Sequence, residues 1–245
     1  MQTPQGFHTP LFIKRLIQLI VGFTLLGALL EPFTMRFWGV SLQSILSLTP
    51  LATSRYFVWQ FVTSIFFIPT ATLSFGFFLD LAFSMLILWL FGTLLYERIG
   101  SKRFIIGTLI AAITSGVSAL LAMLALQEAH LYSECLPAIL AVVTMWTMAD
   151  PSQQLYLLFL LPLKAQWVLA IALVATILGN ALDYNYVAAA GYLGAFLASY
   201  FYGLFVLDFR SPFAFMLGFD RVAKKSWYHI RSFWQWHILS LFRKK

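Results

Sequence analysis

Two pairs of side chains in this sequence could do chemistry, and the first is a thiol with an imidazole. Cys135 is the single cysteine of the chain, and His130 precedes it by five residues. A thiolate beside an imidazole is a nucleophile with its base, so this pair would predict a hydrolase. A spacing of five does not put both side chains on one helix face, and a lone cysteine near a helix start is more typical of a small buried residue. The thiol hydrolase is therefore the weaker alternative.

Asp80 and Ser84 form the second pair, four residues apart in an otherwise apolar stretch. An ionisable group inside a membrane span is costly, so its presence predicts a function. Ser84 would lie one turn deeper on the same helix face. A hydrated carboxyl near a helix end, with no function, is the other interpretation, and both stay open.

The composition of the chain decides in what kind of element these residues lie. Of 245 residues, 61% are hydrophobic and only 10% are charged, whereas soluble domains carry about 25% charged residues. This is the composition of a membrane protein. One cysteine excludes a disulfide framework and a cysteine-based metal site, and we expect no cofactor. The N-terminal segment has charges inside its apolar run and lacks a cleavage site, so we expect a retained first span.

Apolar runs of about 20 residues predict membrane-spanning helices. Residues 31–74 are interrupted by prolines and arginines, so we expect short helices at the membrane surface there. Within residues 155–179 we expect the helix to follow Pro162, with the earlier part in a loop or at the membrane edge. The fold class is therefore all-α, with six spans and a short fourth one, at 11–30, 75–96, 104–126, 135–149, 155–179 and 186–207.

The distribution of basic residues predicts the orientation of these spans. With the N-terminus inside, fourteen Lys and Arg residues lie on the inner side and only Arg36 and Arg55 on the outer side. Cytoplasmic loops carry an excess of Lys and Arg, so both termini are expected in the cytoplasm. We divide the chain into a membrane domain, 1–207, and a basic tail, 208–245.

The tail carries +6 of the net charge of +7. Aromatic and apolar residues recur in the tail at helical spacing, and basic residues flank them. This pattern is typical of an amphipathic helix on an anionic membrane surface. The alternative is a plain topology signal, and no polar domain exists that would present the charge to a nucleic acid. The residues expected at the membrane surface are Lys224, Lys225, Trp227, Arg231 and Trp234.

Four segments in this order resemble the rhomboid superfamily of intramembrane serine proteases, over roughly residues 11–207. They are "RYFVWQFVTSIFFIP" (55–69), "FLDLAFSMLILWLFGTLLYERIGSKRF" (78–104), "ECLPAILAVVTMW" (134–146) and "NYVAAAGYLGAFLASYFYG" (185–203). The turn "YERIGSKRF" is similar to the "LEERLGSRRF" turn of bacterial members, which implies a bacterial inner membrane. The resemblance implies a serine nucleophile at the start of the fourth helix and a histidine base on the sixth.

This sequence departs from the family at each of those positions. The nucleophile position is Leu136, within Glu134–Cys135–Leu136–Pro137, and the base position is Gly191. The oxyanion positions of the second helix become Asp80 and Ser84, and the Trp-Arg pair of the first loop becomes Trp59 and Gln60. No histidine lies between residues 131 and 228, so a shift in register does not recover a base. The resemblance therefore implies the rhomboid architecture without the serine–histidine dyad, and hence no enzyme.

The function expected from this departure is recognition of transmembrane helices of client proteins by a pseudoprotease. The candidate client-binding residues are the degenerate positions Trp59, Gln60, Asp80, Ser84, Leu136 and Gly191. Ala190, Gly194 and Ala198 recur every four residues on the last span and predict a helix-packing face. The resemblance implies that this face contacts the fourth helix, and generic helix packing is the other interpretation. Two alternatives remain, a hydrolase that uses Cys135 and His130, and a small transporter or channel. The derlin branch of the superfamily also lacks the dyad, and it aids extraction of membrane proteins.

Overall fold

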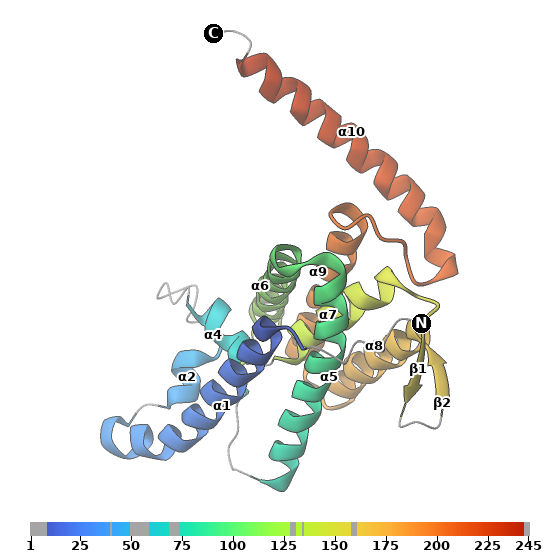
Figure 1. Ribbon diagram of the computed structural model, residues 1–245. Coiled ribbons are helices and arrows are strands. Elements are labelled where there is room, and N and C mark those ends of the chain that lie inside the picture. The colour runs from blue at the N-terminus through green and yellow to red at the C-terminus, as the bar shows by residue number, and fades with distance from the viewer. Residues whose placement is uncertain are drawn as a thin grey trace.

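The computed structural model describes residues 9–39, 41–49, 59–68, 74–127, 131–133, 135–157 and 161–242. Element labels follow Figure 1. The membrane helices are α1 (Leu11–Trp38), α5 (Phe75–Ile99), α6 (Ser101–Leu126), α7 (Leu136–Ala149), α8 (Ala165–Leu182) and α9 (Tyr186–Phe205). The remaining elements are α2 (Leu42–Leu46), α4 (Gln60–Phe66), β1 (Gln154–Leu157), β2 (Leu161–Lys164), a 3₁₀ turn η1 (Ala214–Met216) and α10 (Leu217–Phe242).

The helical bundle has the predicted class and the predicted order of spans. Within the described ranges, five helices are long and apolar enough to cross a membrane, and α7 is a shorter apolar helix of 14 residues. Residues 137–148 of α7 are all buried, because α5, α6, α8 and α9 pack around it. Trp146 of α7 meets Phe91 of α5 edge-on, with ring centroids 4.7 Å apart. The short fourth helix at the centre of the bundle is thus confirmed.

The first helix is longer than the sequence predicted. We expected the first span to end at residue 30, but α1 continues through Pro32 to Trp38 and ends at Gly39, whose φ of 66° is left-handed. A proline inside a helix removes one backbone hydrogen bond but does not always end the helix. Here Glu31 supports this part of the chain, because its carboxylate accepts from Ser41 Oγ at 2.6 Å and from Gln43 N at 3.1 Å. The prediction of surface helices is therefore wrong for residues 31–38, whereas α2 and α4 lie within the predicted segment.

A β-hairpin stands where the sequence predicted a loop or membrane edge. Strands β1 and β2 pair antiparallel, with Gln154 opposite Lys164. Ala165 N donates to Gln153 O at 2.9 Å and so joins the hairpin directly to α8. Pairing satisfies backbone groups that a loop beside apolar surroundings would leave without partners. The helix that follows Pro162 begins at Ala165, as predicted.

The tail forms one long helix that leaves the bundle. Figure 1 shows α10 running away from the other helices, with its first turns near the end of α9. The hairpin and α8 lie on one side of the bundle, and α1 with α2 lies on the other (Figure 1). Side chains of α10 are described up to residue 229.

Candidate functional site

The position matched to the family's nucleophile is the first residue of α7. Leu136 is 39% exposed, and Cys135 before it is 1% exposed. Pro137 lies in the first turn of the helix, where a missing N–H costs little. Leucine carries no nucleophilic atom, and the neighbouring thiol is enclosed by the bundle. Glu134 and His130 lie outside the described residues.

The position matched to the family's base lies in α9 and faces Tyr132. Gly191 is buried, and a Cβ atom built on it would lie 2.2 Å from the hydroxyl oxygen of Tyr132 and 2.6 Å from Cζ of its ring. Real Cβ atoms do not approach other atoms so closely. The tyrosine ring therefore fills the space that any side chain at position 191 would need.

Tyr132 is held in this place by its backbone and by its hydroxyl. Its backbone forms an isolated bridge with Leu48, with N···O distances of 2.7 and 2.9 Å. Its hydroxyl lies 2.7 Å from Ser115 Oγ of α6, and both residues are buried. The next residue, Ser133, donates to the carbonyl oxygens of Phe67 at 2.5 Å and Ser64 at 3.1 Å. These contacts fix the segment before α7 against the first loop and α6.

A cavity of about 10 Å³ remains beside Tyr132. It lies between Ser64 of α4, Ser115 of α6 and Pro137 of α7. About 10–15 Å³ is the least space that holds one water molecule. The cavity is too small for a peptide segment.

Asp80 and Ser84 lie one turn apart on α5 but differ in burial. Helix α5 is capped by Ser74, whose hydroxyl accepts from Phe77 N at 3.2 Å. Asp80 follows in the second turn and is exposed, whereas Ser84 is buried. Among the described residues no hydrogen bond joins the two side chains. Asp80 therefore faces the surroundings of the bundle, and Ser84 faces its interior.

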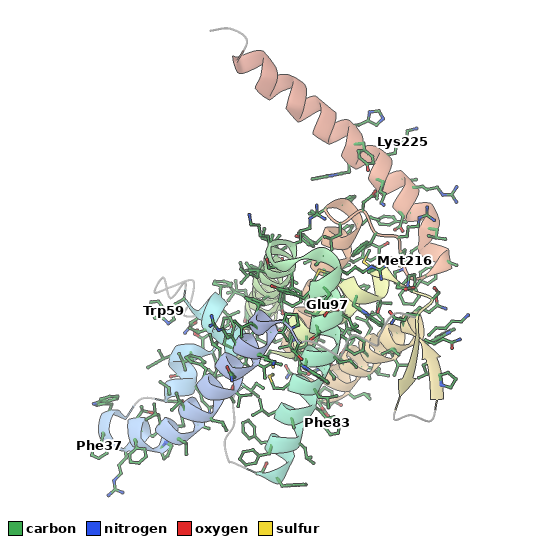
Figure 2. The ribbon with its side chains drawn as sticks, viewed as in Figure 1. Phe37, Trp59, Phe83, Glu97, Met216 and Lys225 are labelled. Carbon is green, nitrogen blue, oxygen red and sulfur yellow. The ribbon has the colours of Figure 1, made fainter. Side chains whose placement is uncertain are left out.

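Trp59 and Gln60 are neighbours with opposite placements. Trp59 projects outward beside α4 (Figure 2). Gln60 is 0% exposed. Its amide oxygen accepts from Thr49 N and Thr49 Oγ1, both at 3.2 Å, and its amide nitrogen donates to the carbonyls of Ser44 and Ile45, both at 3.3 Å. Gln60 thus joins α4 to α2 and to Thr49, which follows α2. Gln60 is therefore buried in the free protein, and its role in client binding stays a prediction.

The small residues of α9 lie against α6 as well as α7. A Cβ atom built on Gly194 would lie 2.2 Å from Ser118 Oγ and 3.0 Å from the carbonyl oxygen of Thr114, both in α6. Ala190 and Ala198 on the same stripe are half-buried. The close approach at Gly194 is therefore with the third span, and not with the fourth as the resemblance implied.

Helices α5 and α8 border one side of the bundle. Both helices pack against α7, but they make few contacts with each other. Only Ala165 and Leu169 of α8 are buried. Phe83 projects outward from α5 (Figure 2), and Val174 on α8 is exposed as well.

The first turns of the tail are attached to the end of α9. Asp220 is buried, where it accepts a hydrogen bond from the Tyr200 hydroxyl and another from Ser211 N at 2.8 Å. Trp227 stacks on Phe205 of α9, with ring centroids 5.0 Å apart. Of the predicted membrane-surface residues, Lys224 pairs with Asp208 at 2.5 Å, Lys225 points away from the bundle (Figure 2), and the side chains of Arg231 and Trp234 lie outside the described part.

Sequence reasoning missed Tyr132 and the Tyr200–Asp220 contact. No pattern in the sequence places Tyr132 beside Gly191, because the two residues lie 59 positions apart in the chain. No pattern in the sequence links Tyr200 to Asp220. Across the described ranges, no group of three or more His, Cys, Asp or Glu side chains gathers where a metal could bind.

Comparison with protein families identifies the family to which this chain belongs. The model of the rhomboid domain matches residues 57–209, which include α4 to α9. The match covers more than half of the chain, and the protein therefore belongs to the rhomboid family. It is an integral membrane protein with several spans. A search of curated proteins found no match.

Proposed function

We propose that the protein is a catalytically inactive rhomboid, a pseudoprotease that recognises the transmembrane helices of client proteins. The observation that carries the proposal is the contact of Gly191 with Tyr132. Acyl transfer needs a nucleophile with a base beside it. Gly191 at the base position has no side chain, and Tyr132, which is hydrogen-bonded to Ser115, occupies the space that a side chain would need. Leu136 at the nucleophile position supports the same conclusion.

The side of the bundle between α5 and α8 is where a client helix would bind. Client recognition needs a lateral opening and a surface, but it needs no dyad. In lipid, helices associate through close packing and through polar groups, because lipid tails are as apolar as leucine. Asp80 supplies such a polar group on the exposed surface of α5. It would pair with a basic or polar residue in the client span, or donate to a client backbone that has loosened from its helix.

Site-directed photo-crosslinking in native membranes tests this assignment. A photoreactive phenylalanine analogue at Phe83 of α5 or at Val174 of α8 should capture client spans. The matched control is the same analogue at Ile106, which is 50% exposed on α6. We expect adducts with membrane helices at positions 83 and 174 and only background at 106. Equal capture at all three positions would mean that these adducts report random collisions in the membrane.

Two substitutions of Asp80 separate the possible roles of its carboxyl. If charge pairing holds the client, both Asp80→Asn and Asp80→Leu should reduce capture at position 83. If a protonated donor holds it, Asn should be tolerated and Leu should not. Wild-type capture by both variants would show that Asp80 is only a hydrated residue near a helix end.

The orientation and the tail belong to the same proposal. We place both termini in the cytoplasm of a bacterium, with the basic tail on the anionic inner leaflet, because each Lys or Arg near such a surface contributes about 1 kcal/mol. With Cys135 replaced by serine, a charged thiol reagent added from outside should label Asp183→Cys and not Ser101→Cys. The reverse pattern would overturn the orientation. Salt-insensitive binding of the 221–245 segment to anionic vesicles would leave the tail as a topology signal.

A further inference from the structure

An apolar cavity of about 290 Å³ lies between α1 and α6, and α5 contributes only Leu88 to its lining. We call it the α1–α6 cavity. Phe12 and Phe104 line one end, Phe66 and Cys135 line the other, and Thr108 and Ile139 line the walls between them. Phe12 and Ile20 of α1 both line it, and eight helical residues span about 12 Å. The cavity is thus elongated along α1 and reaches the central helix α7.

The end of the cavity marked by Phe12 is the end of the bundle that is rich in basic residues. The Phe12 ring stacks on Tyr96 of α5 and meets Phe104 of α6 edge-on, with ring centroids 5.8 and 6.1 Å apart. Four exposed cations lie in the first turns of these two helices, Lys14 and Arg15 on α1 and Lys102 and Arg103 on α6. Of the described acidic residues near the ends of α5 and α7, Glu97 is exposed and Asp150 pairs with Arg98 at 3.9 Å, while Asp208 beyond α9 pairs with Lys224. This end therefore has an excess of positive charge.

Helical spacing distinguishes the two cations of α1. Arg15 lies three residues after Phe12 and four before Leu19, and both of these line the cavity. Residues three and four apart share a helix face, so Arg15 lies on the cavity side. Lys14 lies two residues after Phe12 and belongs to the opposite side of the helix. A guanidinium beside the mouth of an apolar cavity suits a phosphodiester, which it binds through two parallel hydrogen bonds.

We propose that the α1–α6 cavity binds one acyl chain of an anionic phospholipid, with the headgroup phosphate at Arg15 and Lys102. The chain enters beside Phe12 and Phe104 and ends against α7 near Cys135 and Ile139. Its contacts differ from those of ordinary surrounding lipid, because Cys135 and Ile139 are buried core residues of the bundle. The site is separate from the proposed client surface, so neither proposal depends on the other.

Photolabelling of the full-length protein in nanodiscs tests the chain site. The probe is phosphatidylglycerol with a diazirine midway along one acyl chain, present as a trace in phosphatidylcholine. Adducts should concentrate on residues 16–20 and 105–112 and around residue 139. Thr108→Phe fills the cavity and should abolish these adducts, whereas Ile106→Phe, two residues away and not part of the lining, should leave them unchanged. Equal labelling of the two variants would overturn the proposal.

Headgroup selectivity tests the charged end. Arg15→Gln should lower phosphatidylglycerol labelling about five-fold, the equivalent of about 1 kcal/mol for one cation at an anionic surface. Lys14→Gln is the matched control and should preserve labelling. Neither residue is buried, so both variants are expected to fold. The proposal is overturned if the phosphatidylcholine analogue labels the cavity equally well, or if the two variants lose labelling to the same extent.

Discussion

Helices α8 and α9 follow each other in the chain and are similar in length and apolar character, yet they are packed very differently. Most of α9 is buried, with its glycines in contact with α6 and with Tyr132, whereas α8 buries only two residues. Gly191 and Gly194 let neighbours approach closely, while Ile171, Val174 and Leu178 of α8 point outward. Because lipid is as apolar as leucine, small residues rather than hydrophobicity decide which helix is held tightly. The bundle thus has a closely packed half around α9 and a loosely held helix α8.

A substitution at the tightest point of α9 should have the largest effect on stability. In Gly194→Ala, the new methyl group meets Ser118 Oγ at 2.2 Å and the Thr114 carbonyl oxygen at 3.0 Å, and a backbone carbonyl cannot move aside easily. Overpacking of this kind costs about 1–3 kcal/mol. The free energy of unfolding, measured by steric trapping in bicelles, should fall by an amount near the upper end of this range.

The control for Gly194→Ala is the same change in α8. Gly179 has no atom within 4 Å of a built Cβ, so Gly179→Ala should be neutral, or stabilising by up to about 1 kcal/mol through helix propensity. Equal losses in the two helices would contradict the comparison.

The contact between Gly191 and Tyr132 should appear as an energetic coupling. Gly191→Ala alone should lose about 2 kcal/mol of unfolding free energy, because Tyr132 is fixed at both its backbone and its hydroxyl. In a Tyr132→Ala background the same change should cost much less, with a coupling of about 0.5–3 kcal/mol in a double-mutant cycle. Additive losses would show that the tyrosine does not occupy the space beside Gly191.

The anchor between α9 and the tail should have a smaller effect. Tyr200→Phe removes the hydroxyl that donates to the buried Asp220 carboxylate, and a hydrogen bond to a charged group contributes about 1.5 kcal/mol or more. Hydrogen exchange should rise in the first turns of α10. Lys224→Gln breaks only an exposed ion pair and should cost under about 1 kcal/mol. Faster hydrogen exchange in Lys224→Gln than in Tyr200→Phe would show that the ion pair, and not the Tyr200–Asp220 hydrogen bond, holds the first turns of α10.

The exposed surface of α8 should be the least sensitive region. Trp167→Ala and Val174→Ala truncate side chains that project away from the bundle, and surface changes usually stay within about 0.5 kcal/mol. Unfolding free energies near that of the wild type, together with lower client capture at position 83, would assign these side chains to binding. A loss of several kcal/mol in either variant would show that α8 is held tightly after all.

The sequence predicted the spans well, because a helix crosses the membrane only where the apolar run is long and uninterrupted, and the length of such runs can be read from the sequence. It did not predict the extension of α1 through Pro32, since the support comes from Glu31 contacts with residues 41 and 43. The hairpin was missed because residues 154–164 are as apolar as the spans and carry no turn signal of their own. Such contacts depend on folding and leave little trace in local patterns.

In the candidate site, too, residue types were predictable from the sequence, whereas contacts between distant residues were not. The resemblance identified Leu136 and Gly191 as positions without catalytic side chains, and residue type alone sufficed for that prediction. It could not predict that Tyr132 fills the space beside Gly191, because the two residues are far apart in the chain. The burial of Gln60 was not predicted for a related reason, since a polar residue in a loop gives no sign of the four hydrogen bonds that its amide makes.

The loss of catalysis is the central claim, and proteolysis by purified protein in liposomes tests it most directly. The substrate is a transmembrane segment with a helix-destabilising sequence, and cleavage is followed by mass spectrometry. The account predicts no cleavage by the unmodified protein or by Leu136→Ser, because Gly191 still provides no base and Tyr132 fills the space beside it. Cleavage by the unmodified protein that is lost in Cys135→Ala would contradict the account and identify a thiol hydrolase.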